Sequence, residues 1–203
     1  MVESTALEHL RKDPVLAACI VDDPPLHWPL YTDVYESLLR SIVFQQLNGK
    51  AAETIHQRFL NLFPDQLPDP EQILELDIVQ LRSVGLSGQK AQYVQHVASF
   101  ALANKRLQLD WDEMSDEEIL TFLTQIKGVG RWTVEMILIF TLRRPDIFPL
   151  DDYGIQHAIK MAYNIDYQGK ELRFFMQKTA ENWKPYRSYA TRYLWNFFSN
   201  NNN

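Results

Sequence analysis

Two short stretches contain residues whose types and spacing are suited to chemistry. The first is the turn KGVGR at residues 127–131, in which Gly128 and Gly130 lack a Cβ and so permit positive φ and the close approach of another backbone. Apolar residues at helical spacing precede and follow the turn, so the amides of Gly130, Arg131 and Trp132 are expected at the start of a helix. Free N–H groups and the positive end of a helix dipole attract phosphate. The sequence therefore predicts a phosphate site at this turn.

The second stretch is the acidic turn FPLDDY at residues 148–153. Pro149 breaks the preceding helical pattern, and Asp151 or Asp152 begins a new one. An aspartate in that place routinely caps a helix by accepting a hydrogen bond from a backbone amide. A carboxylate held there can also stabilise positive charge that develops on a substrate, or orient and deprotonate a water molecule. Spacing alone does not decide which of the two acids takes which role.

Four stretches, in this order, resemble the helix-hairpin-helix DNA glycosylases of base excision repair. They are SLLRSIVFQQLNGKAAETI, LSGQKAQYV, IKGVGRWTVEMI followed by the acidic turn, and WKPYRSYATRYLWNFF. The resemblance covers roughly residues 33–198 and is strongest to the branch that removes alkylated bases, the 3-methyladenine DNA glycosylase II type. A GVG hairpin alone also occurs in DNA-binding proteins without catalysis, so the specific signal is the set of four.

The resemblance implies a fold and an activity. The fold would be all-α and two-lobed, with the active-site cleft between the lobes. The activity would be that of a glycosylase that flips alkylated purines, such as 3-methyladenine and 7-methylguanine, out of double-stranded DNA and hydrolyses the N-glycosidic bond. The family's catalytic aspartate is the second acid of a DDY sequence at the head of the helix after the hairpin, which corresponds to Asp152. Bifunctional relatives carry a lysine two residues after the second hairpin glycine, where this chain has Trp132, so no AP-lyase activity is expected.

Aromatic residues are expected to hold the extruded base. The indole of Trp132 would attract a cationic alkylated purine by cation–π stacking, on the order of 0.5 to 2 kcal/mol. Trp195 matches the family's second pocket indole, or else packs in the core of the last helix. Phe44 and Tyr153 are further candidates for the pocket wall. Met136 stands where the family usually has a tyrosine, one turn after Trp132, and this substitution affects the pocket's shape and selectivity.

Residues on three turns are expected to contact DNA. Leu47 matches the family position that enters the duplex where the damaged nucleotide has left, or else it closes its helix as an ordinary core leucine. The weaker glycine turn at residues 84–88 could reach a second phosphate through Ser87 and the amides of Gln89 and Lys90, although such turns more often simply connect two helices. The main hairpin would supply the other contacts, through Lys127, Gly128, Val129, Gly130, Arg131 and Thr133.

Cofactors are expected to play little part. The five histidines lack ligand spacing, so no side-chain metal site is predicted. The single cysteine excludes an internal disulfide and a four-cysteine iron–sulfur cluster, and it is typical of a reducing compartment. A Na⁺ or K⁺ ion on the hairpin's backbone carbonyls is the one cofactor that the hairpin suggests.

The charge distribution bears on the choice of partner. The net charge of −6 argues against nucleic acid, because phosphate neutralisation usually needs surplus lysine and arginine. However, residues 119–203 hold 11 basic and 7 acidic residues, and a backbone-amide grip needs fewer side-chain charges. Two alternatives to the alkylbase reading remain: a glycosylase for deaminated or mismatched bases, and a hairpin DNA-binding protein without catalysis.

The elements that must position these residues are all predicted to be helices. Residues 33–47 form a strong helical pattern capped by Asp33, and Ser115 with Glu118 forms a capping box that starts the first hairpin helix. No strand pattern is found. We expect a single domain over residues 1–203, with one lobe at about 33–118 and another at about 119–198 joined by the segment 1–32. The chain is expected to be a cytoplasmic monomer, nuclear in a eukaryote, without a signal peptide or membrane span.

Overall fold

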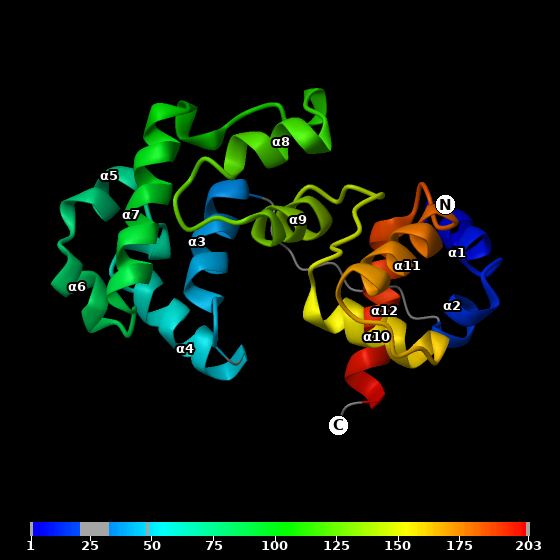
Figure 1. The fold of residues 1–203 in the computed structure, drawn as a ribbon. Coiled ribbons are helices and arrows are strands. Elements are labelled where there is room, and N and C mark those ends of the chain that lie inside the picture. Colours follow the sequence, from blue (N-terminus) through cyan, green and yellow to red (C-terminus); the bar gives the residue numbers. More distant parts are fainter. Residues whose placement is uncertain (1, 21–32, 48, 202–203) are drawn as a thin grey trace. The chain divides into compact units, whose positions relative to one another are not determined.

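The computed structural model describes residues 2–20, 33–47 and 49–201, and every regular element within these ranges is helical (Figure 1). This confirms the predicted all-α class. The α-helices are α1 (Val2–Leu10), α2 (Pro14–Cys19), α3 (Val34–Phe44), α4 (Gly49–Leu60), α5 (Pro70–Glu75), α6 (Ile78–Ser83), α7 (Gly88–Ala103), α8 (Asp116–Leu123), α9 (Arg131–Phe140), α10 (Tyr153–Tyr163), α11 (Gly169–Glu181) and α12 (Arg187–Asn201). Short 3-10 turns lie at Pro64–Gln66, Lys105–Leu107 and Trp111–Glu113. None of the helices in the described ranges is long and apolar enough to span a membrane.

The chain divides into two compact units, and the division differs from the expected one. One unit is Leu30–Ile137, and the other combines Met1–Pro29 with Leu138–Asn203. The first hairpin helix therefore belongs with the preceding helices, although the sequence suggested a boundary near residue 118. The reason is aromatic packing: the ring of Phe122 on α8 lies 5.0 Å from that of Phe100 on α7 and 6.3 Å from that of Trp111. Periodicity along α8 could not identify these partners.

In the unit Leu30–Ile137, helices α3 and α7 form the centre. The Asp33 carboxylate caps α3 by accepting from the Glu36 amide at 2.9 Å, as predicted. Leu38 and Ile42 of α3 are fully buried, and α3 packs against α7. Helices α5 and α6 cover α7, and α4 packs on α3 (Figure 1).

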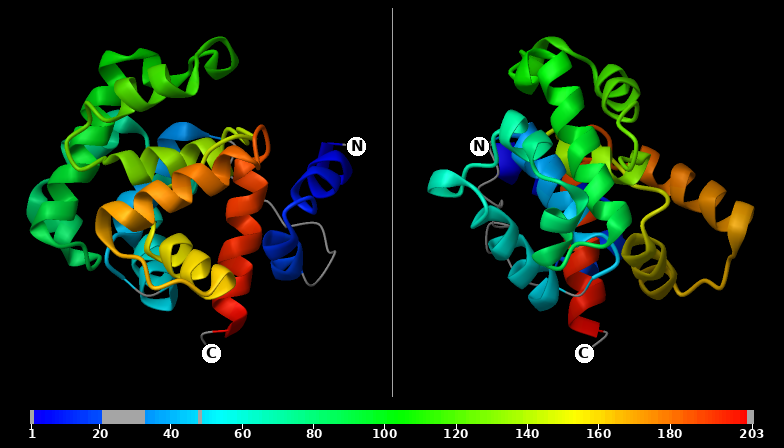
Figure 2. Two further views of the ribbon diagram at one scale, coloured as in Figure 1. Left: turned by 45° about the vertical axis from the view of Figure 1, so that its right-hand side comes forward. Right: turned by 90° about the vertical axis from the view of Figure 1, so that its left-hand side faces the viewer.

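In the other unit, α10 packs against α12, and α2 contacts both (Figures 1 and 2). The core between them contains Leu16, Ile155, Ile159 and the fully buried Trp183. Helix α12 continues to Asn201, beyond the lobe end expected near residue 198. Residues 202 and 203 lie outside the described ranges.

Asp13 ties the two ends of this second unit together. Its carboxylate caps α2 by accepting from the amides of Val15 and Leu16. It also accepts from the Tyr163 hydroxyl at 2.5 Å and from Trp183 Nε1 at 3.0 Å. One N-terminal carboxylate therefore holds the ends of α10 and α11.

Candidate functional site

Each of the two compact units carries one group of candidate residues. The hairpin between α8 and α9 lies in the unit Leu30–Ile137, where Ser115 and Glu118 form the predicted capping box at the start of α8. Gly128 has a φ of +100°, and a Cβ built on it would lie 2.3 Å from Cγ of the Tyr93 ring. Glycine is therefore required at position 128 both by its backbone conformation and by the tyrosine beneath it.

Gly130 differs from Gly128 in both respects. Its φ is not positive, and no protein atom lies within 4 Å of a Cβ built on it. Both hairpin glycines permit positive φ, and only Gly128 adopts it. Nothing within the described protein requires a glycine at position 130, so the open space there is available to a ligand.

Helix α9 starts immediately after Gly130. Its first helical hydrogen bond runs from the Val134 amide to the Gly130 carbonyl at 3.2 Å. The amides before Val134 have no acceptor within the helix, as in any first helical turn. Lys127 and Gly130 are exposed, whereas the side chains of Val129 and Thr133 are buried. A contact of Thr133 with DNA could therefore use only its backbone amide, and Val129 anchors the turn in the core.

The two hairpin cations have different surroundings. Arg131 Nε pairs with Glu135 Oε1 at 3.0 Å, and Arg131 Nη1 lies 3.7 Å from Glu117 Oε1. Lys127 forms no ion pair with any residue that the structure describes. Lys127 is thus the hairpin cation that is available to a phosphate, and Arg131 is partly neutralised within the protein.

The turn after α3 is bonded to the hairpin. Gln45 Nε2 donates to the Gly128 carbonyl at 3.0 Å across 83 residues of sequence. Gln46 then takes a left-handed conformation with φ +56°, and Leu47 is 39% exposed. Asn48, the next residue, lies outside the described residues. An exposed Leu47 does not match its alternative reading as a core leucine, while its role in DNA stays a prediction.

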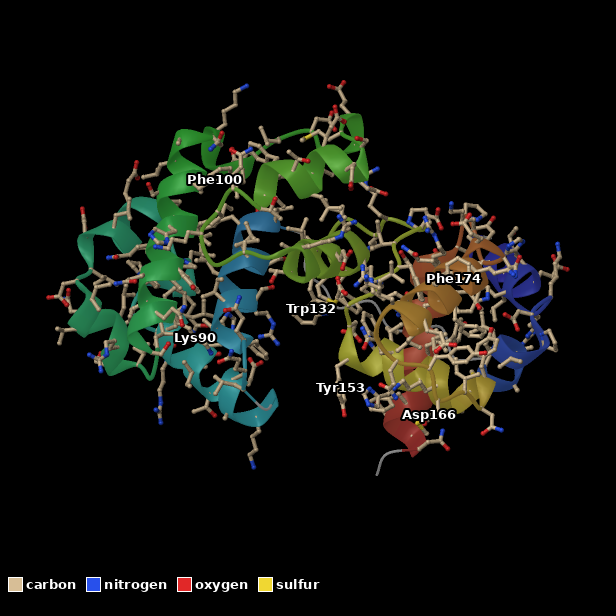
Figure 3. The ribbon with its side chains drawn as sticks, in the orientation of Figure 1. Lys90, Phe100, Trp132, Tyr153, Asp166 and Phe174 are labelled. Carbon is tan, nitrogen blue, oxygen red and sulfur yellow. The ribbon has the colours of Figure 1, made fainter. Side chains whose placement is uncertain are left out.

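Trp132 and Phe44, both predicted to hold the base, have different accessibility. Trp132 lies in the first turn of α9 and is 45% exposed (Figure 3). Phe44 is half-buried, and the Arg40 guanidinium stacks on its ring at 3.7 Å from the centroid. The His56 ring meets Phe44 edge-on, and burial together with Arg40 lowers the His56 pKa. Trp132 is therefore the accessible aromatic surface of the two.

Ser87 acts as a helix cap. Its hydroxyl oxygen accepts from the Lys90 amide at 3.2 Å at the start of α7, and Lys90 Nζ donates to the Val43 carbonyl at 2.7 Å. The Lys90 amide expected to reach a phosphate is thus already bonded within the protein. The glycine turn at residues 84–88 connects α6 and α7, which is its alternative reading.

The acidic turn lies in the unit that contains the C-terminus, and its two aspartates have opposite surroundings. Asp151 is exposed and pairs with Arg173 of α11. Asp152 is only 8% exposed and caps α10, with Oδ1 accepting from the Ile155 amide at 2.8 Å. The same oxygen accepts from Trp195 Nε1 of α12 at 2.8 Å. Asp152 is thus the acid with a fixed, buried carboxylate, and it is also the cap.

Trp195 is held on two sides. Its ring stacks on Phe140, with centroids 5.6 Å apart and planes 17° apart, and its N–H is bonded to Asp152. Tyr153, by contrast, is 67% exposed and packs against His157 and Phe198 (Figure 3). Trp195 is therefore the aromatic residue in contact with the candidate acid. Contact of either ring with a base stays a prediction.

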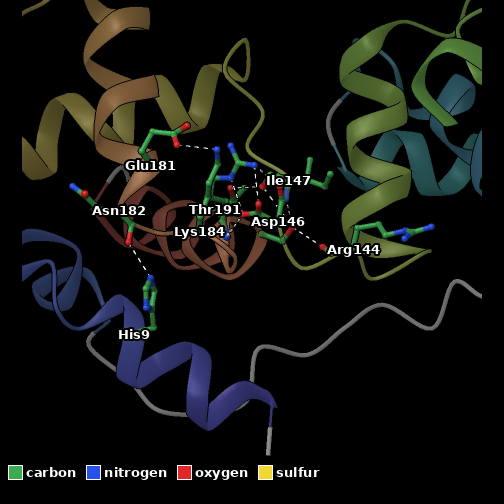
Figure 4. A network of polar contacts seen from close by, with 10 residues as sticks. His9, Arg144, Asp146, Ile147, Glu181, Asn182, Lys184 and Thr191 are labelled. Carbon is green, nitrogen blue, oxygen red and sulfur yellow. Dashed lines mark hydrogen bonds and ion pairs between the residues drawn. The ribbon is translucent and has the colours of Figure 1, made fainter. Parts of the chain in front are cut away.

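A polar network fixes the loop that leads into the acidic turn (Figure 4). The fully buried Ser188 hydroxyl donates to the Arg144 carbonyl at 2.6 Å, and its oxygen accepts from the Ile147 amide at 2.9 Å. Arg187 binds Asp146 with two N–H groups, at 2.7 and 2.9 Å. Arg187 therefore holds this loop in place.

Several contributors were not expected from the sequence. Gln45, Tyr93 and Phe140 act on the candidate residues through contacts between segments that are distant in the chain. Gly154 lies two residues after Asp152, and only that proximity could have drawn attention to it. Spacing within a single segment reveals none of the other three.

The sequence predicts no metal site formed by side chains and suggests a monovalent cation on the backbone carbonyls of the hairpin. Within the described ranges, no group of three or more His, Cys, Asp or Glu is arranged to hold a metal ion. The hairpin carbonyls of Ile126 and Gly128 accept hydrogen bonds from Val129 N and Gln45 Nε2. Each carbonyl keeps a second lone pair, and the expected monovalent cation stays a prediction.

Three comparisons place this geometry among known proteins. Residues 39–185 match the family model described as the HhH-GPD superfamily of base excision DNA repair proteins. The Bacillus subtilis protein YfjP is 38% identical over 175 residues, which cover 82% of this chain but only 60% of that relative. DNA-3-methyladenine glycosylase 1 of Schizosaccharomyces pombe is 36% identical over 163 residues, 79% of this chain and 71% of that protein. The solved S. pombe 3-methyladenine DNA glycosylase Mag1, in complex with abasic DNA, matches with a TM-score of 0.81 and 31% identity, over 94% of this chain and 95% of that one.

Proposed function

The chain belongs to the HhH-GPD superfamily of base excision DNA repair proteins, and from that premise we propose that it is a monofunctional glycosylase for alkylated purines. It extrudes bases of the 3-methyladenine and 7-methylguanine type from duplex DNA and hydrolyses their N-glycosidic bond. Relatives that carry the name DNA-3-methyladenine glycosylase support this choice of substrate.

The observation that carries the proposal is the environment of Asp152. Bond cleavage leaves an oxocarbenium-like sugar, which a preplaced anion stabilises. Asp152 provides such an anion, because Ile155 N and Trp195 Nε1 both hold its Oδ1 at 2.8 Å in a position that is 8% exposed. A carboxylate that is already oriented needs little reorganisation as the positive charge develops. Asp152 can also orient the attacking water.

The hairpin supports DNA as the partner. The open space at Gly130, the amides at the start of α9 and the unpaired cation of Lys127 together suit one backbone phosphate. The grip uses backbone groups more than side-chain charge. This accommodates the net charge of −6.

Trp132 supports hydrolysis without strand cleavage. A bifunctional enzyme of this superfamily needs an amine at this position to form a Schiff base with the sugar, and an indole cannot do so. The exposed ring of Trp132 instead offers a face on which a flat, cationic base can stack. Alkylated purines are already good leaving groups, so stacking and one carboxylate suffice.

Methylated duplex DNA is the substrate that tests the proposal. Chromatography of the reaction should show free 3-methyladenine and 7-methylguanine, and a gel should show intact strands until alkali cleaves the abasic sites. Release of uracil or hypoxanthine instead would indicate a glycosylase for deaminated bases. DNA binding without release of any base would indicate a helix-hairpin-helix DNA-binding protein without catalytic activity.

Replacing Asp152 with Asn tests the assignment of the acid. The rate of base release should fall by about 10²- to 10³-fold, because the charge that stabilises the sugar is lost. DNA affinity, measured by fluorescence anisotropy, should be unchanged or tighter. Asp151→Asn is the matched control, since it alters only an exposed ion pair with Arg173, and it should keep near-normal rates. Full activity of Asp152→Asn would refute the assignment.

Two further parts of the proposal concern the hairpin ion and the assembly state. If a monovalent cation binds the hairpin carbonyls, DNA binding should be tighter in K⁺ or Na⁺ than in a bulky organic cation at equal ionic strength.

We also propose that the protein acts as a monomer. Light scattering after size exclusion should then give a mass near 23.8 kDa.

A further inference from the structure

The space beside the candidate acid depends on a glycine. Gly154 is the second residue of α10, two positions after Asp152. A Cβ built on it would lie 3.2 Å from Asp152 Oδ1, 3.2 Å from Trp195 Cδ1 and 3.4 Å from Trp195 Nε1. These are the two groups joined by the 2.8 Å hydrogen bond between the indole N–H and the carboxylate. Gly154 therefore faces the bond itself.

Backbone conformation does not explain this glycine. Gly154 is not among the glycines with positive φ, which are Gly85, Gly128 and Gly169. Glycine is also one of the poorest residues in a helix, and alanine would normally be preferred in the first turn of α10. The feature that disfavours a side chain is the crowding by Asp152 and Trp195.

Neither neighbour can move away freely. The indole of Trp195 is stacked on Phe140, and Asp152 Oδ1 is also bonded to the Ile155 amide. An added methyl would have to displace the ring or the carboxylate by a few tenths of an ångström. Either displacement lengthens or bends the bond between them.

We propose that Gly154 is a positioning residue for the reaction: its missing side chain lets the Trp195 indole donate to Asp152 and so sets the direction of the carboxylate. The inference rests on the proposed function, because it assigns the carboxylate the task of facing the reacting sugar. It also gives Trp195 a role that does not depend on contact with the base. Gly154 itself touches neither substrate nor reacting atoms.

Kinetics of Gly154→Ala test the proposal. We expect kcat for release of 7-methylguanine to fall roughly tenfold, because small misplacements of a reacting group are costly. KM and the affinity for DNA should stay within about twofold, since the hairpin residues are untouched. The melting temperature of Gly154→Ala should stay close to that of the wild-type protein, because the loss of rate comes from misplacement of the carboxylate and not from unfolding. Gly88→Ala, in the first turn of α7 with only Arg82 Cδ at 4.0 Å, shows the stability change of the same substitution without crowding.

A double-mutant cycle with Trp195→Phe asks whether the methyl acts through the indole bond. Trp195→Phe removes the N–H donor and keeps an aromatic ring. If Gly154 acts through that bond, Gly154→Ala should cost little more once the donor is absent, so the double variant should be about as slow as the slower single one. Losses that multiply would overturn the proposal, as would a Gly154→Ala enzyme with unchanged kcat.

A spectroscopic test separates the geometry from the activity. The Trp195 indole N–H gives its own signal in a ¹H–¹⁵N spectrum, identified by its loss in Trp195→Phe. Gly154→Ala should move that signal toward the position of a more weakly bonded indole, while the other indole signals stay. An unmoved signal would overturn the proposal whatever the rate. If the wild-type protein releases no base, the proposed function fails and the reaction role of Gly154 with it, whereas the signal still reports on the contact.

Discussion

At the scale of single residues, neighbouring side chains of one type have acquired different roles. Asp151 and Asp152 are adjacent and chemically identical, yet one is an exposed partner of Arg173 and the other is buried under an indole donor. Gly128 and Gly130 form a similar pair. Tyr93 crowds the first, while open space surrounds the second. In both pairs the difference comes from residues distant in the chain.

The two hairpin glycines should therefore respond differently to alanine. Gly128→Ala should destabilise the protein by about 2–4 kcal/mol, because the new methyl overlaps the Tyr93 ring and the backbone is left-handed. Gly130→Ala should change stability by less than about 0.5 kcal/mol but weaken DNA binding. Thermal denaturation and anisotropy measure the two effects. Equal stability losses would contradict the open geometry at Gly130.

At the scale of elements, Asp13 shows how a cap becomes an anchor. It caps α2 and also accepts hydrogen bonds from two side chains. Tyr163 is the last residue of α10, and Trp183 follows the end of α11. Burial raises the pKa of the Asp13 carboxyl, but the hydrogen bonds from these two side chains and two amides outweigh it, so the pKa is lowered overall. A lowered pKa means that the folded protein favours the charged form.

This anchor predicts a dependence of stability on pH. Because the folded pKa of Asp13 lies below the unfolded value of about 3.9, its contribution is complete above that value and is lost as pH falls through the folded pKa. Asp13→Asn should therefore cost about 2 kcal/mol at pH 7 and much less near pH 2 in urea unfolding. Asp77→Asn, at a cap on α6 whose carboxylate accepts from the backbone amide of Gln80, should be nearly neutral at both pH values. A pH-independent loss in Asp13→Asn would contradict this account.

Features that depend on residues close together in the sequence could be predicted, whereas features that depend on contacts between distant segments could not. Helices and caps such as Asp33 and the Ser115–Glu118 box were predictable, because their signals lie within a few residues. The resemblance of the acidic turn makes Asp152 the candidate acid, and the structure adds a hydrogen-bond donor to it, Trp195. The lobe boundary near residue 118 was wrong, because Phe122 packs on Phe100 and Trp111. Such pairs cannot be identified from periodicity.

At the scale of the whole molecule, the charge does not follow the division suggested by sequence. Counted over the two compact units, Leu30–Ile137 holds 9 basic and 15 acidic residues, and the other unit holds 11 of each. The unit that contains the hairpin is thus acidic, not basic. The proposed binding of DNA would therefore rely on a few well-placed groups.

A shallow salt dependence should result. If the phosphate grip is mostly amides plus Lys127, the logarithm of the binding constant should fall with the logarithm of salt concentration with a slope of only about −2 to −3. Lys127→Ala should reduce that slope by about one, measured by anisotropy at several KCl concentrations. Lys178→Ala, an exposed cation on α11, serves as the control and should leave the slope unchanged. A steep slope that Lys127→Ala does not alter would contradict the amide-based grip.

The N-terminal helices α1 and α2 share a compact unit with the last third of the chain, while the residues between form the other unit. During synthesis, the intervening segment emerges whole and can fold while the ribosome is still translating. The leading helices, in contrast, find Tyr163 and Trp183 only once these residues, 150 and 170 positions after Asp13, have been made. Helices α1 and α2 thus reach these native contacts later than the segment that follows them can fold, and a chaperone that binds nascent chains would meet them in that interval.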